Sequence, residues 1–257
     1  MSPVTLEVEP APSRQDAATP PPSARSALVA RLAARISAST GEVAPFAGVE
    51  RAIAAIADQL FRDRRVVLAQ PVAERIAESA RALARTVLDT GWRDARADAP
   101  RGSAQAAAFE SLVRAARDAD ALVLTSPFLA PGGDASALSP RDLLRLRARA
   151  PRPVIVLDLL DEDLARVPLT QAALLIPGTV ILRGFGRLWR EAGATAAADL
   201  AFVAGAPDLV GTLSMGIEVD GVDEDFADSV VRDLGRAGIE RAIQSAAVGF
   251  RVPFERD

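Results

Sequence analysis

Three residues that can do chemistry come directly after apolar segments of the chain. Ser126 closes the run ALVLTS, Asp158 closes PVIVLD, and Arg187 follows TVILRG after the short turn FG. A serine hydroxyl can act as a nucleophile, a carboxylate as a general acid or base, and a guanidinium as the partner of an anion. Ligands of open parallel sheets bind where the strands end. The sequence therefore predicts a candidate site built from the ends of several strands.

The composition narrows what such a site could do. The 257 residues include 30 basic ones, all of them Arg, and there is no Lys, His, Cys or Tyr. Side chains that titrate near neutral pH are therefore missing. Acid or base catalysis is left to Asp and Glu, and a covalent imine on a lysine is excluded. Because the usual zinc and iron ligands are absent, we predict no metal site.

Charge and hydrophobicity exclude two classes of partner. The net charge of -4 and the scattered arginines give no basic footprint for nucleic acid. There is no apolar run of membrane-spanning length, and the first 24 residues, rich in Pro, Ser and Ala, lack the pattern of a secretory signal. We therefore expect a cytoplasmic protein with a disordered tail over residues 1–24; the alternative is a tail that packs across a partner subunit.

Apolar segments then alternate with amphipathic ones. Strands are predicted at residues 64–70, 121–126, 153–158, 179–184 and 200–205, and helices at 28–36, 49–61, 72–84, 109–117 and 141–149. Wholly apolar strands between amphipathic helices indicate an α/β fold, a mainly parallel sheet with helices on both faces. We assign residues 25–212 to this large domain and 213–257 to a reduced C-terminal α/β segment.

Six segments, taken in order, resemble the large domain of the fold-type I pyridoxal-phosphate enzymes, the class I/II aminotransferase family. They are GVERAI, RRVVLAQP, DADALVLTSPFLAPGGD, PVIVLDLLDED, PGTVILRGFGRLWREAG and LAFVAGAPDLV, between residues 48 and 210. Within that family the segments are most similar to threonine-phosphate decarboxylases and histidinol-phosphate aminotransferases. The resemblance implies a truncated homologue whose cofactor would be pyridoxal 5'-phosphate.

The resemblance also assigns roles to three residues. Gly48 matches the glycine of a loop that offers backbone N–H groups to the cofactor phosphate at a helix N-terminus. Asp158 matches the carboxylate that pairs with the pyridine nitrogen. Arg187 stands where the family has its Schiff-base lysine, and a guanidinium cannot form the imine. Its side chain is expected either to bind an anion such as phosphate or to pair with Asp158.

Other family contacts are missing, so no catalytic residue is assigned. Ala73 replaces an aromatic residue that stacks on the cofactor, Leu129 or Ala130 an asparagine, Asp161 a tyrosine, and Gly184 a phosphate-binding serine. The arginine for the substrate carboxylate, expected soon after Gly193, is absent from the segment ATAAADL.

The candidate residues and segments also have structural interpretations that need no ligand. Asp158 could be a helix cap or a loop residue without a ligand. The acidic run Asp161, Glu162 and Asp163 could hold a cation, although a solvated helix start is the more common role of such a run. The segment VDGVDEDFAD lacks the ligand spacing of a calcium loop.

Three functions remain open. The first is a catalytically degenerate homologue that serves as a binding or partner subunit, in a homodimer or in a heterodimer with an intact homologue. The second is an aminotransferase or lyase, of cobalamin or amino-acid biosynthesis, that uses the cofactor noncovalently or completes a site in a heterodimer. The third is a remnant that keeps only its fold. We favour the first, because more family contacts are lost than kept.

Overall fold

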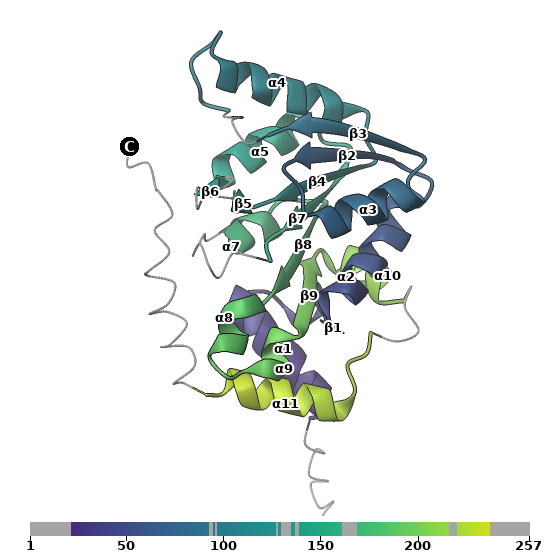
Figure 1. Cartoon of the computed structure of the whole chain (residues 1–257), viewed down its shortest axis with the longest axis vertical. Coiled ribbons are helices and arrows are strands. Elements are labelled where there is room, and N and C mark those ends of the chain that lie inside the picture. The colour runs from purple at the N-terminus through teal and green to yellow at the C-terminus, as the bar shows by residue number, and fades with distance from the viewer. Residues whose placement is uncertain are drawn as a thin grey trace, which may run out of the picture.

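The structure is a computed structural model that describes residues 22–92, 95, 97–126, 128–129, 135–136, 139–160, 169–215 and 220–236. Its centre is a seven-stranded sheet in the order β1-β9-β8-β7-β4-β2-β3 (Figure 1). The strands are β1 (Val43–Ala47), β2 (Arg65–Gln70), β3 (Thr86–Gly91), β4 (Ala121–Thr125), β7 (Val154–Asp158), β8 (Thr179–Gly184) and β9 (Leu200–Gly205). A separate two-stranded sheet joins β5 (Phe128–Leu129) to β6 (Ala135–Ser136).

The sheet is mainly parallel. Strands β3, β2, β4, β7 and β8 pair in parallel, while β9 is antiparallel to both of its neighbours, β8 and β1. Because β9 is reversed, β1 again points the same way as β8. The carboxyl ends of six strands therefore lie along one edge of the sheet, as the sequence predicted for its candidate residues.

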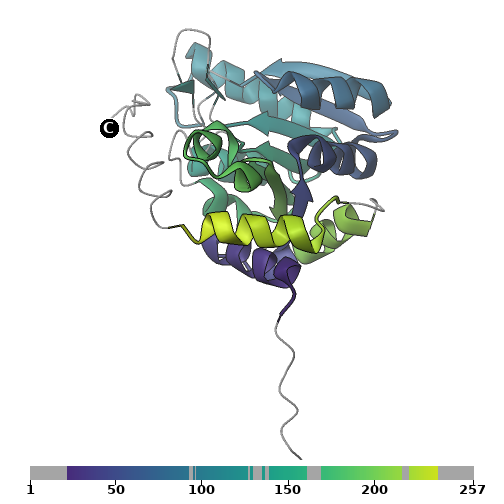
Figure 2. The ribbon, with the colours of Figure 1, turned by 60° about the horizontal axis from the view of Figure 1, so that its bottom comes forward.

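Helices cover both faces of the sheet. They are α1 (Ala24–Ile36), α2 (Val49–Ile56), α3 (Glu74–Leu83), α4 (Ala104–Arg117), α5 (Pro140–Arg149), α7 (Leu169–Leu174), α8 (Gly186–Glu191), α9 (Thr195–Ala198), α10 (Pro207–Met215) and α11 (Glu224–Leu234). A π-helical turn, η2 (Ala57–Phe61), continues α2. Figure 2 shows α11 lying along α1, with which it makes tertiary contacts.

The core is split into two layers by the sheet. Alternate strand residues face opposite sides, as in Leu122 and Leu124 against Val123 on β4. One layer packs beneath α1, α4, α5, α9 and α11, and the other beneath α2, α3 and α10. Both faces of the central strands are therefore apolar, which explains their continuous hydrophobic runs in the sequence. The predicted α/β fold, with a mainly parallel sheet and helices on both faces, is confirmed.

Short polar side chains start several of the helices. The side-chain oxygens of Ser103, Ser139 and Asp223 accept backbone N–H groups at the first turns of α4, α5 and α11, at 3.2, 3.0 and 2.7 Å. These are N-caps, which satisfy donors that have no partner within the helix. Ser139 is followed by Pro140 at the first helical position, where its missing N–H and fixed φ suit a helix start.

Two strands and some helix ends differ from the prediction. No strand was predicted at β1 or β3, and the helix predicted from residue 109 begins at Ala104. The boundary drawn after residue 212 falls inside α10. The division into two domains remains a prediction, and the tail to residue 21 lies outside the described residues.

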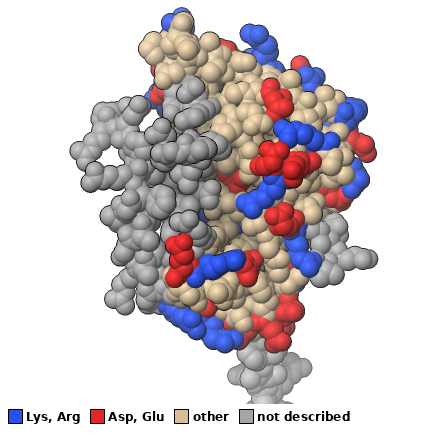
Figure 3. Space-filling model, viewed as in Figure 1, with Lys and Arg blue, Asp and Glu red and all other residues tan. Residues whose placement is uncertain are grey.

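Charges of both signs are interspersed on the face shown in Figure 3. Within the described ranges, no helix is both long and apolar enough to cross a membrane.

Candidate functional site

The candidate site lies at the carboxyl edge of the sheet, where β4, β7 and β8 end side by side. Thr125, the last residue of β4, is the register partner of Asp158, the last residue of β7. Asp158 is in turn the partner of Leu182 on β8, which ends at Gly184. Gly48 follows β1, and β9 separates it from β8. The structure thus brings Asp158 close to β8 and leaves Gly48 two strands away from Gly184.

Asp158 is buried, with 2% of its surface exposed, and its carboxylate is held by groups of the chain itself. Oδ2 accepts the hydroxyl of Thr125 at 3.3 Å, and Oδ1 accepts the backbone N–H of Leu160 at 3.1 Å. The Thr125 hydroxyl also accepts the N–H of Ala73 at 3.3 Å. A chain of hydrogen bonds therefore joins the loop after β2 to β4 and β7. These bonds supply the hydrogen-bond donors that a buried carboxylate requires.

Sequence reasoning missed two residues of this network. We predicted Ser126 as the candidate side chain of β4, but Thr125 is the residue whose hydroxyl reaches the carboxylate. Ser126 instead donates its backbone N–H to the carbonyl of Asp158 at 2.9 Å. Leu160 was also missed, although its position two residues after a strand-ending Asp is typical of an Asp that accepts a nearby backbone N–H.

Gly48 forms the turn between β1 and α2. Its φ of +108° is a conformation that favours glycine, and its N–H donates to the carbonyl of Phe46 at 3.0 Å. That donor is thus directed at its own strand. Glu50 lies in the first turn of α2, where its negative charge already profits from the helix dipole. Both features work against an anion at this helix N-terminus.

Leu160 covers Gly184 at the end of β8. A Cβ built on Gly184 would lie 3.1 Å from Cδ2 of Leu160 and 3.4 Å from the carbonyl oxygen of Leu200. The space that a serine side chain would enter is therefore occupied by an apolar methyl group. The residues around Gly184 therefore favour apolar packing over the binding of a phosphate group.

Arg187 is the second residue of α8, and its side chain lies outside the described part of the structure. Two residues before and after it in the chain, Phe185 and Trp189 are buried, and their rings meet edge to face with centroids 4.8 Å apart. The expected anion contact or pairing with Asp158 therefore stays a prediction. The side chain of Leu129, Ala130 and residues 161–163 also lie outside the described part.

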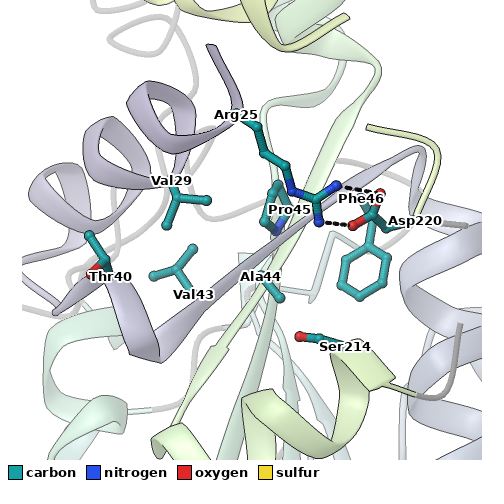
Figure 4. A pocket seen from close by; sticks show the side chains of 9 residues that line it. All are labelled: Arg25, Val29, Thr40, Val43, Ala44, Pro45, Phe46, Ser214 and Asp220. Atoms are coloured by element: carbon teal, nitrogen blue, oxygen red, sulfur yellow. Dashed lines mark hydrogen bonds and ion pairs between the residues drawn. The ribbon is translucent and has the colours of Figure 1, made fainter. Parts of the chain in front are cut away.

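A separate hollow of about 190 Å³ lies beside β1, between α1 and α10 (Figure 4). Arg25 and Asp220 form an ion pair at its wall, and Arg25 also donates to the carbonyl of Val222 at 3.2 Å. Its remaining lining comes mainly from apolar residues, such as Val29 and Val43. Since its charges are already paired, this hollow is not a strong candidate for an ionic ligand.

No protein-family model and no curated protein sequence matches the chain. Several solved structures are similar to it. The L-threonine-O-3-phosphate decarboxylase of Porphyromonas gingivalis is 17% identical, with a TM-score of 0.62, over 91% of this chain and 65% of that one. The histidinol-phosphate aminotransferase of Sinorhizobium meliloti, solved with pyridoxal-5'-phosphate, is 15% identical, with a TM-score of 0.68, over 88% and 58%. The chain has the aminotransferase fold.

Aspartate aminotransferase from Thermus thermophilus, solved with maleate, gives a TM-score of 0.64 at 17% identity, over 88% of this chain and 58% of that chain. This agrees with the sequence resemblance to fold-type I enzymes. The chain spans about three fifths of the length of these three proteins. At such identities the comparison establishes the fold and leaves activity to be argued from the site.

The described residues do not fit pyridoxal phosphate held as the resemblance implies. The Asp158 carboxylate already has two donors from the chain, the Gly48 N–H is directed at Phe46, and Leu160 fills the space beside Gly184. No lysine exists to form a covalent link. The assignment of Gly48, Asp158 and Arg187 to cofactor binding remains a prediction for a binding measurement to decide.

Proposed function

We propose that this chain is a catalytically degenerate member of the aminotransferase fold that acts as a binding or partner subunit. The observation that carries the proposal is the Asp158 network. The carboxylate that would tune a cofactor is instead bonded to Thr125 and to the Leu160 N–H, in a chain without lysine. Polar groups that hydrogen-bond to one another stabilise this edge of the fold even when no ligand is bound.

The proposed partner is a second chain of the same fold, either another copy or an intact homologue. Helices α5 and α7 contact each other, and the chain exposes one large apolar side chain on α5 and another just after α7. Leu144 on α5 is 55% exposed, and Leu175, which follows α7, is 84% exposed. We infer that the two side chains belong to one exposed apolar surface, of the kind that marks protein–protein interfaces. We therefore place the partner against α5 and α7.

The assembly test uses light scattering and sedimentation of the purified full chain at micromolar concentration, alone and mixed with an intact homologue. We expect a homodimer or a hetero-complex. Leu144→Glu and Leu175→Glu should each weaken it, because a charge would be buried in an apolar contact. Leu88→Glu is the matched control, since Leu88 is 39% exposed and lies on the edge strand β3, outside α5 and α7. A stable monomer under all these conditions would contradict the partner role.

The cofactor test separates this proposal from its main alternative, an enzyme that uses pyridoxal phosphate noncovalently. Purified protein is mixed with the cofactor, and binding is followed by absorbance and by equilibrium dialysis. We expect no saturable binding and no aminotransferase or decarboxylase activity from the chain alone. A cofactor adduct fixed on a side chain by borohydride, or saturable binding that Asp158→Asn abolishes, would favour the enzyme instead.

A further inference from the structure

Strand β3 is the last strand at one end of the sheet, and among the described strands it pairs with β2 alone (Figure 1). Its side chains are open to solvent: Thr86, Leu88 and Asp89 are exposed, and Val87 is half-buried. An edge strand presents a row of backbone groups to which another strand can bond. The outer side of β3 is therefore a surface suited to a further strand.

The hydrogen bonds to β2 show which backbone groups of β3 are directed outward. The N–H of Thr86 donates to the carbonyl of Arg64, directly before β2, at 3.3 Å, and the N–H of Trp92, directly after β3, donates toward β2 at 2.9 Å. Every second residue of a parallel strand bonds to a given neighbour, so the even-numbered residues of β3 are directed at β2. Val87 and Asp89 therefore direct both their N–H and their C=O to the outer edge.

Arg85 brings a positive charge to the start of this edge. It is exposed and directly precedes the strand. Among the described residues no carboxylate forms an ion pair with Arg85, and Asp120 is affected by its charge only through space. The guanidinium is therefore available to a carboxylate of another chain.

Asp89 brings a negative charge to the same edge. Its Oδ1 accepts the side-chain N–H of Gln70 at 2.6 Å and lies 4.0 Å from the guanidinium of Arg81. Because 51% of the side chain is still exposed, the carboxylate has room for a further donor. Arg85 and Asp89 thus lie at equal distances along the chain before and after Val87, with opposite charges.

We propose that β3 pairs in antiparallel orientation with β3 of a second copy of this chain, about a two-fold axis at Val87. Val87 then lies opposite Val87 of the second copy, and Asp89 lies opposite Arg85 of the second copy on both sides of the axis. The outward N–H and C=O groups bond across the axis, and the half-buried valines cover each other. The two sheets join into one continuous sheet.

The charges select a second copy as the occupant and fix the register. A two-fold interface must be complementary to itself, and this strand carries both signs at equal spacing from its centre. A register centred on Asp89, or on Arg85, would instead place like charges opposite each other, which is destabilising. The contact lies outside α5 and α7, so it goes beyond the proposed function and leaves those helices to the partner subunit.

Cysteine cross-linking tests the register, since the chain has no cysteine of its own. Val87→Cys places two thiols across the axis, where the Cα atoms of a hydrogen-bonded pair lie about 5.5 Å apart, within the span of a disulfide. With oxidised glutathione as the oxidant, we expect a covalent dimer on a non-reducing gel. Leu88→Cys is the matched control. In this register the two residues at position 88 are diagonal neighbours, about 7–8 Å apart, and should stay unlinked.

Charge reversal tests the occupant. The dimer is measured by sedimentation equilibrium of a parent chain that carries Leu144→Glu and Leu175→Glu, which remove the contact proposed at α5 and α7. Arg85→Asp alone, or Asp89→Arg alone, should weaken the dimer about tenfold, because each sets like charges opposite each other on both sides of the axis. The two reversals combined restore opposite charges and should return the affinity to within about twofold of the parent.

Leu88→Glu is the control for the reversals, since its charge would lie opposite the uncharged Thr86 and should leave the dimer unchanged. Circular dichroism checks that every variant is folded. The proposal is overturned if the parent chain is monomeric, if Val87→Cys and Leu88→Cys cross-link equally, or if the combined reversal is as weak as the single ones. None of these results bears on the partner role, because the parent chain lacks the α5 and α7 contact.

Discussion

The hydroxyl of Thr125 donates to Oδ2 of Asp158 at 3.3 Å, across the register pair that ends β4 and β7. Both residues are buried, Thr125 at 7% and Asp158 at 2% exposure. The same hydroxyl accepts the N–H of Ala73, so the pair fixes the loop after β2 as well. A carboxylate at the carboxyl edge of a sheet, where ligands usually bind, is here part of the internal structure.

Thr125→Val tests this role. It keeps the shape of the side chain and removes the donor, which leaves the buried Asp158 carboxylate with one fewer hydrogen bond. We expect the free energy of unfolding to fall by about 1–3 kcal/mol, as measured by urea denaturation. Because Thr125→Ser retains the hydroxyl, its free energy of unfolding should fall clearly less. Equal losses for the two variants would mean that packing of the methyl group, and not the hydrogen bond, stabilises this edge.

Leu160 and Gly184 should be energetically coupled. Gly184→Ser places a Cβ 3.1 Å from Cδ2 of Leu160, so the leucine must move or the strand must shift. We expect a destabilisation of about 1–2 kcal/mol for the single variant. When Leu160 is also replaced by Ala, Gly184→Ser should lower the free energy of unfolding clearly less. We expect a coupling energy on the order of 1 kcal/mol in this double-mutant cycle. Additive effects would show that the two side chains do not compete for this space.

The central strands could be predicted because both of their faces are buried, which makes runs such as ALVLT and VIVLD continuously apolar. The two edge strands could not. In β1, Pro45 contradicts a strand assignment, and it is tolerated because β1 is an edge strand. In β3, the sequence TVLDTG is polar and largely exposed, so it lacks the apolar signal.

The position of the candidate site could be predicted from the sequence, but its hydrogen bonds and packing contacts could not. The carboxyl edge follows from the order of apolar strands, and Asp158 was placed there correctly. Whether Thr125 or Ser126 faces Asp158 depends on the strand register, since neighbouring residues point to opposite sides of a sheet. The contact between Leu160 and Gly184 joins the turn after β7 to the end of β8, and the direction of the Leu160 side chain is set by tertiary packing.

Asp120 should make stability depend on acid pH. The backbone N–H of Arg65 at 3.0 Å, and then the guanidinium of Arg152, hold the pKa of this carboxyl below its usual value. A lowered folded pKa gives stability that is complete above the unfolded pKa, about 3.9, and is lost as the pH falls through the folded value. Asp120→Asn should therefore lower Tm at pH 7 and flatten the acid decline of Tm below about pH 4. The exposed Glu78→Gln is the control and should leave both unchanged.

Arg187→Lys tests whether one substitution explains the lost chemistry. The change supplies the lysine amine that the chain lacks, at the second position of α8, directly after Gly186. Several other contacts stay absent, at Ala73, Leu129, Gly184 and around Thr195, and catalytic groups that act as a unit are strongly non-additive. We expect at most a weak, nonspecific imine with added pyridoxal phosphate in absorbance spectra. Assays with phosphothreonine, and with histidinol phosphate plus a keto acid, should stay near background. Turnover within about a hundredfold of an ordinary enzyme, whose kcat is roughly 10 per second, would show instead that the edge of this sheet is still organised for catalysis.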